Sequence, residues 1–235
     1  MGTLINAAAI IIATLIGVIF KKGLPERIQK SVMMALGLGL VALSLGWFIK
    51  DFFVIENNTI RTQHDLLIIV SLVLGVLMGE WIDIEDKLNR FALSIEQKYK
   101  LPPLAKGFVA ATLIFCVGAM AIVGSIKDGL QGDMTILLIK SALDFVTAMI
   151  LASVLGIGVM FSAVSVLIYQ GSITLLAMVG ADVLTPDIIQ TLSVIGNILL
   201  IGIGINFMEI KRIKVANMLP ALLIPIIYYT ILALF

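Results

Sequence analysis

Ionisable side chains are scarce in this sequence. Charged residues occupy 13% of its 235 positions, whereas about a quarter is usual in a soluble domain. Hydrophobic residues make up 60% of the chain, and the mean hydropathy is +1.14. No stretch of such a chain favours a soluble domain. We therefore expect an integral membrane protein whose function resides in a single membrane domain over residues 1–235.

Cysteine and histidine are almost absent as well. The one cysteine, Cys116, excludes a disulfide framework within the chain. The one histidine, His64, falls in a polar loop, so neither a Ser–His pair nor a histidine metal site is expected inside the membrane. No G-x-x-x-x-G-K-[ST] string for binding ATP phosphates occurs, and a formal net charge of +1 argues against nucleic acid as a partner. We expect no enzyme and no cofactor.

Apolar runs recur along the whole chain. A membrane-spanning helix needs about 20 residues, and the pattern predicts eight such segments, at 3–20, 30–49, 65–81, 105–126, 134–155, 157–180, 187–208 and 216–235. The predicted fold class is all-α, a polytopic transmembrane helix bundle. Residues 134–180 are apolar almost throughout. Gly156-Ile157-Gly158 predicts a tight hairpin there, and a pair of half-helices interrupted by glycine is the alternative.

Lysine and arginine gather in alternate loops. They are frequent in residues 21–30, 87–106 and 211–214, and sparse in 127–133 and 181–186. Cytoplasmic loops carry the excess of Lys and Arg, and eight crossings place all three basic loops on one side. Both termini are then expected outside. The stretch 82–100 has apolar residues at helical spacing and predicts an amphipathic helix along the inner interface, with a solvated connector as the alternative.

A weak internal repeat links the fourth segment to the sixth. Phe115-Cys116 and Gly124-Ser125-Ile126 recur at nearly the same interval as Phe161-Ser162 and Gly171-Ser172-Ile173. The predicted topology makes these two segments cross in the same direction. The repeat therefore suggests parallel hairpin repeats rather than inverted ones.

Lys140 and Asp144 stand alone in the longest apolar region. No other Asp, Glu, Lys, Arg or His lies between Asp133 and Asp182. A charge at a helix centre in hydrocarbon costs about 2.5–3.5 kcal/mol, so such residues normally face a protein interior or a wet cavity. The i, i+4 spacing puts both side chains on one helix face, within reach of each other. A purely structural ion pair is the alternative to a functional one.

Other polar residues fall at related depths. Counted at about 1.5 Å per residue, Asp144 lies about 15 Å from the outer end of its segment, near mid-bilayer. Gln170 reaches a similar level, and Asn197 also lies near the middle of its segment. Hydrogen bonding to neighbouring helices is the alternative role for Gln170 and Asn197. Asp128 could instead finish a helix at the interface, and Asn6 could cap the first helix. Together the sequence predicts a solute- or ion-binding site made of Asp144, Lys140, Gln170, Asn6, Asp128, Ser125 and Asn197.

Several blocks spread over nearly the whole chain carry a resemblance to a known family. They are the opening residues 2–6 (GTLIN), residues 112–133 (TLIFCVGAMAIVGSIKDGLQGD), Lys140-Ser141 with Asp144, Tyr169-Gln170-Gly171, and residues 217–221 (NMLPA). These blocks resemble uncharacterised bacterial membrane proteins of the YdfK/YqgA family. The resemblance implies a multi-pass protein of the bacterial inner membrane, of a kind often labelled as a transporter. It supplies neither a substrate nor any known binding residue.

The function expected from these features is secondary transport of a small polar solute or ion. Asp144 would be the coupling carboxylate and Lys140 its partner. A channel lined by the same groups is one alternative. A membrane scaffold or sensor that transports nothing, with its basic loops as the partner-binding surface, is another. The expected partners are the lipid bilayer and the solute, and a homo-oligomer is compatible with the sequence.

Overall fold

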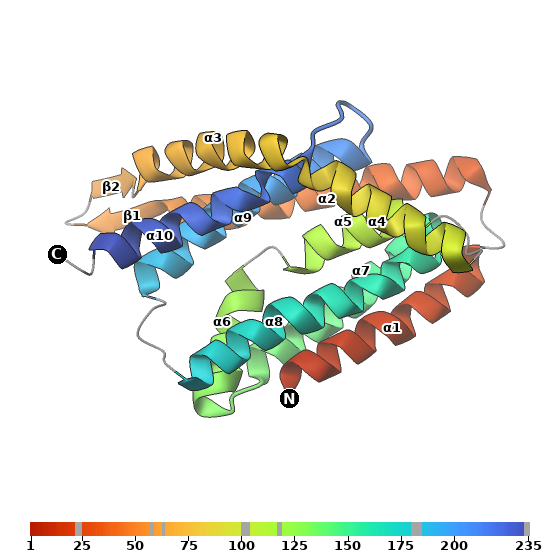
Figure 1. Ribbon diagram of the computed structural model, residues 1–235, viewed down its shortest axis with the longest axis horizontal. Helices are drawn as coiled ribbons and strands as arrows, with labels where there is room; N and C mark the ends of the chain where they lie inside the picture. The colour runs from red at the N-terminus through yellow and green to blue at the C-terminus, as the bar shows by residue number, and fades with distance from the viewer. Residues whose placement is uncertain are drawn as a thin grey trace. The chain divides into compact units, whose positions relative to one another are not determined.

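The computed structural model describes residues 1–21, 25–56, 59–62, 64–99, 104–116, 119–179 and 185–232. Within these ranges seven helices are long and apolar enough to cross a membrane, and a bent pair of shorter helices would add an eighth. The predicted all-α membrane fold is confirmed (Figure 1). Three predicted segments end in residues that the structure does not describe, namely residue 100, residue 180 and residues 233–235.

The chain folds into two compact units that interleave along the sequence. The first comprises Met1–Leu36, Asp86–Cys116 and Met120–Ala181, and the second Gly37–Glu85, Val117–Ala119 and Asp182–Phe235. The first unit contains α1 (Gly2–Lys21), the start of α2 (Glu26–Phe52), most of α4 (Ile84–Tyr99), α5 (Ala105–Cys116), α6 (Ala119–Gln131), α7 (Thr135–Leu155), the 3-10 helix η1 (Ile157–Phe161) and α8 (Ser162–Val179).

α1 and α7 form the main helix pair of the first unit, and they run in the same direction (Figure 1). A methyl group on Gly2 would lie 2.7 Å from the Leu137 side chain. Near the other end, a methyl group on Gly17 would lie 2.2 Å from the carbonyl oxygen of Met149. The small residue at position 17 therefore permits backbone-to-backbone packing, which is the usual role of glycine between membrane helices.

The fourth predicted span is divided between two helices. α5 and α6 meet at an angle of 61°, where the prediction had one straight segment at 105–126; residues 117–118 lie outside the described residues. Together the two helices follow η1 and α8 in parallel. Gly107 approaches Val159, Thr112 Oγ1 donates to Ser165 Oγ at 3.1 Å, and Gly129 approaches Thr174. This is the relative direction on which the suggested repeat depends.

The turn between the fifth and sixth spans is tight. α7 ends at Leu155, and Gly156 adopts φ 86°, ψ −160°, a conformation that favours glycine. Its N–H donates to the carbonyl of Ala152 at 2.9 Å. The structure has the hairpin rather than the two half-helices. A tight hairpin is expected to make its two helices neighbours, and that expectation was wrong: within the described residues α7 and α8 are not packed along their lengths, and α1 contacts both of them.

The second unit contains the rest of α2, a hairpin of β1 (Phe53–Glu56) and β2 (Thr59–Thr62), α3 (Asp65–Ile82), α9 (Pro186–Phe207), the 3-10 helix η3 (Val215–Leu222) and α10 (Leu223–Leu232). α9 is the most deeply buried of the candidate spans in the described residues. α2 and α9 run antiparallel, because Gly37 approaches Gly204 whereas Asp51 accepts a hydrogen bond from Ser193.

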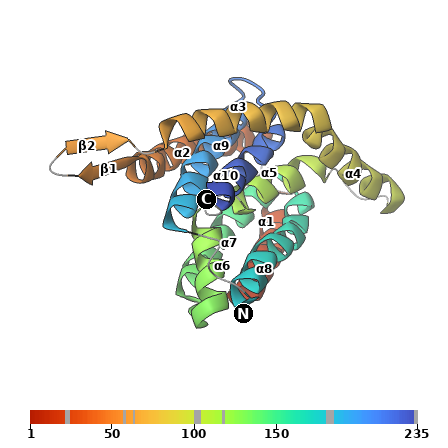
Figure 2. The ribbon, with the colours of Figure 1, turned by 60° about the vertical axis from the view of Figure 1, so that its left-hand side comes forward.

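The connections on either side of α3 contain a β-hairpin that the sequence did not predict and an amphipathic helix that it did. The β1–β2 hairpin, which pairs Phe53 with Thr62 and Glu56 with Thr59, was expected only as a loop; Figure 2 shows it at the N-terminal end of α3. The amphipathic helix predicted at 82–100 is present as α4. It begins just after Asp83, which adopts a left-handed φ of 54° and ends α3.

Candidate functional site

The core of the first unit is polar at one end and apolar at the other. Near the ends of α1 and α7 where both helices begin, the buried side chains include a set that we call the polar cluster: Thr3, Asn6, Ser125, Asp128, Lys140, Ser141, Asp144, Gln170 and Thr174. Toward the other end the buried core is mainly apolar, with Ala13, Ala148, Leu151, Val159, Ala163 and Val166. The membrane core of this unit is thus strongly asymmetric along its length.

The ion pair predicted at i, i+4 is the centre of the polar cluster. Lys140 Nζ donates to Asp144 Oδ2 at 2.5 Å, and the two residues are only 6% and 7% exposed. Asn6 Nδ2 donates to the same carboxylate oxygen at 2.9 Å. Pairing and additional hydrogen bonds are what make a buried charge tolerable. The aspartate therefore has two partners, one on its own helix and one on α1.

The end of α5 lies close to the lysine. Lys140 Nζ is 5.9 Å from the centroid of the Phe115 ring, and Phe115 belongs to the last turn of α5. Cations are favoured near helix C-termini because the last carbonyls are free of intrahelical partners. The C-terminal end of α5 thus lies beside the buried pair.

Asp128 has a structural role at the start of α1. Its Oδ2 accepts hydrogen bonds from the Gly2 N–H at 3.0 Å and from the Met1 amino group at 2.9 Å. Carboxylates are stabilising at helix N-termini, where the first N–H groups have no intrahelical acceptor. Asp128 therefore lies in the last turn of α6 and caps the start of α1, and this contact holds α6 against α1.

Much of the polar cluster has no hydrogen-bond partner among the described residues. The unpaired buried atoms are Thr3 Oγ1, Asn6 Oδ1, Ser125 Oγ, Gln170 Nε2, Gln170 Oε1 and Thr174 Oγ1. Each such group costs about 1–3 kcal/mol when buried without a partner. The buried hydroxyls of the apolar end behave differently: Thr14, Ser153 and Ser162 each donate to a carbonyl of the same or the preceding turn.

Helix register places several of these groups at one level. Gly129 on α6 approaches Thr174 on α8, so Ser125 and Gln170, one turn earlier on these parallel helices, share a level. Asp128 bonds Gly2, and α6 runs opposite to α1. One turn further into the core, Ser125 is therefore level with Asn6, which bonds Asp144.

The predicted site residues are thus divided between the units. Six of them belong to the polar cluster of the first unit, whereas Asn197 lies on α9 in the second unit, where it is 2% exposed. Sequence reasoning missed Thr3, Ser141 and Thr174. Helical spacing contains a signal for two of them, because Thr3 is three residues before Asn6 and Thr174 four residues after Gln170.

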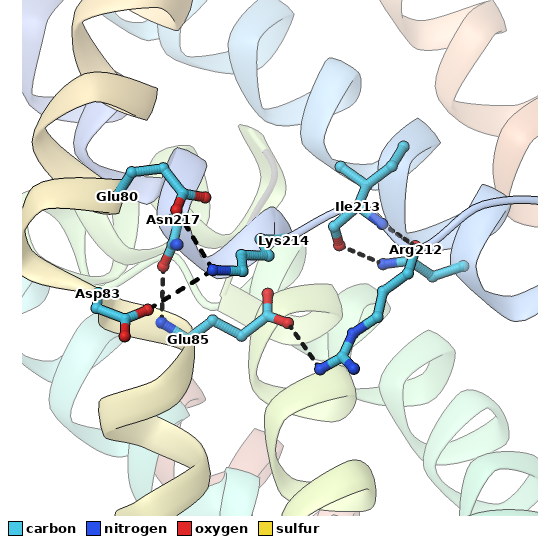
Figure 3. Close-up of polar contacts among 8 residues, drawn as sticks. Glu80, Asp83, Glu85, Arg212, Ile213, Lys214 and Asn217 are labelled. Carbon is cyan, nitrogen blue, oxygen red and sulfur yellow. Dashed lines mark hydrogen bonds and ion pairs between the residues drawn. The ribbon is translucent and has the colours of Figure 1, made fainter.

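A second polar group lies in the second unit, at the junction of α3 and α4 (Figure 3). Lys214 Nζ is 3.3 Å from Glu80 Oε2 and 3.9 Å from Asp83 Oδ1. Arg212 Nη2 is 3.6 Å from Glu85 Oε1, and Asn217 Oδ1 accepts the Glu85 N–H at 2.7 Å. These contacts join the α3–α4 junction to η3 and to the segment that precedes it.

The chemistry of that second group is structural. Arg212 is 79% exposed and Lys214 45% exposed, and exposed ion pairs contribute little, about 0–1 kcal/mol each. No group of three or more His, Cys, Asp or Glu side chains suited to a metal occurs in the described part of the chain. The polar cluster of the first unit is therefore the stronger candidate for a functional site.

Comparison with known proteins gives a consistent family. The model for a family described as "Protein of unknown function (DUF554)" matches residues 1–230. The chain is 36% identical over 224 residues to the "Uncharacterized membrane protein YdfK" of Bacillus subtilis (strain 168), covering 95% of this chain and 93% of that protein. It is 31% identical over 231 residues to the "Uncharacterized protein YqgA" of Escherichia coli (strain K12), covering 95% and 94%. No solved structure matches.

Proposed function

The chain belongs to the DUF554 family of membrane proteins, and we propose that it is a secondary transporter of a small polar solute or ion. We place it in the bacterial inner membrane with both termini outside. One observation carries the proposal: a buried ion pair, Lys140–Asp144, lies among unpaired buried polar groups. Ionisable residues inside a membrane bundle are costly and usually mark a substrate or ion pathway.

The division of the core favours a carrier over a channel. A channel needs a continuous polar path, whereas the polar cluster occupies one end of the first unit only. At the other end, packing is close enough that a methyl group on Gly17 would meet the Met149 carbonyl and one on Gly158 would lie 2.2 Å from the Leu104 carbonyl. Polar groups at one end and close packing at the other are compatible with alternating access, in which a site is open to one side of the membrane at a time.

The bent fourth span supports the same function. Substrate sites of secondary transporters are typically formed where a membrane helix is interrupted, because its free backbone ends can face the solute or ion. Here the end of α5 at Phe115 and Cys116 lies beside Lys140. In this proposal Asp144 is the coupling carboxylate, Lys140 is its counter-ion, and the unpaired groups of Asn6, Ser125 and Gln170 contact the solute.

The test is a counterflow assay with purified protein in liposomes. The probes are labelled urea, uracil, glycine and glycerol, with Na⁺ and H⁺ followed by dyes. Saturable counterflow of a probe, abolished by Asp144→Asn and retained by the control Thr14→Val, supports the proposal. Thr14 suits the control because it bonds only within its own helix. Fast flux that does not saturate would favour a channel. Absence of flux from folded protein would favour a scaffold or sensor.

A further inference from the structure

The unpaired groups of the polar cluster also indicate what kind of solute fits. Resting on the transport function proposed above, we propose that the solute carries no net charge and presents a hydrogen-bond donor next to an acceptor, as amides, ureas and nucleobases do. Gln170 is the residue that recognises this donor–acceptor pair. The remaining unpaired oxygens complete the site.

The charges of the polar cluster are already matched. Asp144 is paired with Lys140 and accepts a hydrogen bond from Asn6, and Asp128 is held by the start of α1. A solute with a net charge would add an unbalanced charge in a region of low dielectric, where the cost is high. A neutral solute avoids that cost and leaves both carboxylates with their present partners.

The free hydrogen-bonding groups are all neutral, and one of them is a complete amide. Gln170 is fully buried, and both its Nε2 and its Oε1 are unpaired. A carboxamide presents two N–H donors and a carbonyl acceptor side by side in one plane. Two parallel hydrogen bonds can therefore form with a second group of the same kind. Both requirements of Gln170 are then met at once.

The orientation of Asn6 adds an acceptor to the site. A carboxylate can only accept hydrogen bonds, so the Asn6 atom that contacts Asp144 must be the amide nitrogen. Its oxygen, Oδ1, is the unpaired atom. The hydroxyls of Thr3, Ser125 and Thr174 can each donate or accept. The site thus offers one amide pair, one further acceptor and three adaptable hydroxyls.

Charged solutes match this set of groups less well. A small cation could use the neutral oxygens, yet it would leave Gln170 Nε2 without an acceptor and would lie near the ammonium of Lys140. An anion would meet the carboxylates of Asp128 and Asp144 and the acceptor oxygen of Asn6. In either case at least one buried group is repelled or unpaired, which a neutral donor–acceptor solute avoids.

The test measures binding and transport separately on the full-length protein. In detergent, ligand binding raises the melting temperature, and the probes are urea, uracil and N-acetylglycinamide, with Na⁺ and acetate as charged comparisons. Losing two hydrogen bonds should weaken binding about tenfold or more. We therefore expect uracil or N-acetylglycinamide to stabilise the wild type, with at least a tenfold weaker Kd in Gln170→Met and an unchanged Kd in Thr14→Val.

Each result separates this inference from the transport proposal. Binding of none of the neutral probes, or equal binding by wild type and Gln170→Met, overturns the inference. Saturable transport of Na⁺ or acetate without binding of the neutral probes overturns it while transport stands. Binding of a neutral probe with no counterflow overturns transport and leaves the site as a receptor for such solutes. If Gln170→Met does not fold, Gln170→Leu replaces it, since it is an apolar residue of similar size that also lacks the amide donor and acceptor.

Discussion

Separating Lys140 from Asp144 tests whether the buried pair holds the first unit together. Lys140→Met leaves the carboxylate with Asn6 as its one remaining hydrogen-bond partner among the described residues, at 2.9 Å. Asp144→Leu leaves the ammonium without its carboxylate and also removes the acceptor of the Asn6 amide. We therefore expect Asp144→Leu to be the more harmful single change. The double variant Lys140→Met/Asp144→Leu removes both charges and should be less harmful than either.

The size of the effect follows from the burial of the pair. Both residues are less than 10% exposed, and stranding one member of a buried pair costs about 3–5 kcal/mol, whereas replacing both by apolar residues is often close to neutral. For a protein of this size 1 kcal/mol shifts the melting temperature by about 2–4 °C. Each single variant should therefore melt about 6–20 °C below the wild type, and the double variant within a few degrees of it.

The assay is thermal unfolding of purified protein in detergent, with Thr147→Val as the matched control. Thr147 lies on the same helix, is only half-buried, and donates to the Leu143 carbonyl of its own helix, so its replacement should change the melting temperature little. Single variants as stable as the double variant would refute the reasoning, because the charges would then not depend on each other. Equal loss in the control would show that α7 is sensitive to any change.

Three further predictions address topology, packing and pH. Because α1 and α7 run parallel, an odd number of membrane crossings must separate them, and this holds only if α5–α6 counts as one crossing besides α2 and α3. The chain then has eight crossings, so a reporter fused to the C-terminus should be active on the outer side. Activity of that reporter in the cytoplasm would contradict the topology. A methyl group on Gly79 would lie 1.8 Å from the Asn217 carbonyl, so Gly79→Ala should lower stability by about 1–3 kcal/mol in thermal melts, whereas Gly39→Ala, with nothing within 4 Å, should not. Hydrogen bonds from Thr135 lower the pKa of Asp133. The stability that this carboxylate contributes is therefore present above the ordinary Asp pKa range and is lost as the pH falls through the lowered pKa. Asp133→Ala lacks this contribution, so its melting temperature should fall less than that of the wild type between pH 7 and pH 3.

The limits of the helices were accessible from the sequence because each depends on nearby residues. Long apolar runs predict spans, and the glycines at 156 and 158 predict the turn between two of them. The ion pair was accessible for the same reason, since an i, i+4 spacing on one helix fixes which side chains can meet. The β1–β2 hairpin was missed because its two strands have only four residues each and are partly polar. A short, partly polar sequence is also typical of a loop.

The contacts between helices were less accessible, because they depend on helix rotation and on which helices are neighbours. Tight turns make consecutive helices close at one end only, and α1 instead of α8 contacts α7 along its length. The partner of Asp144 is consequently Asn6, 138 residues away in sequence. The bend between α5 and α6 was missed for a related reason, since the sequence there remains apolar across the break.

This neighbour relation also explains why the polar cluster has a satisfied part and an unsatisfied part. Asn6 on α1 and Lys140 one turn away on α7 together satisfy the Asp144 oxygen that they share, and this part can hold the helices together without a solute. Gln170 on α8 has no such partner among the described residues, although it lies at the same level. Folding alone does not need a buried, unpaired amide, since an apolar residue of similar size would avoid its cost. The solute-binding role proposed for Gln170 would account for a burial that helix packing alone does not require.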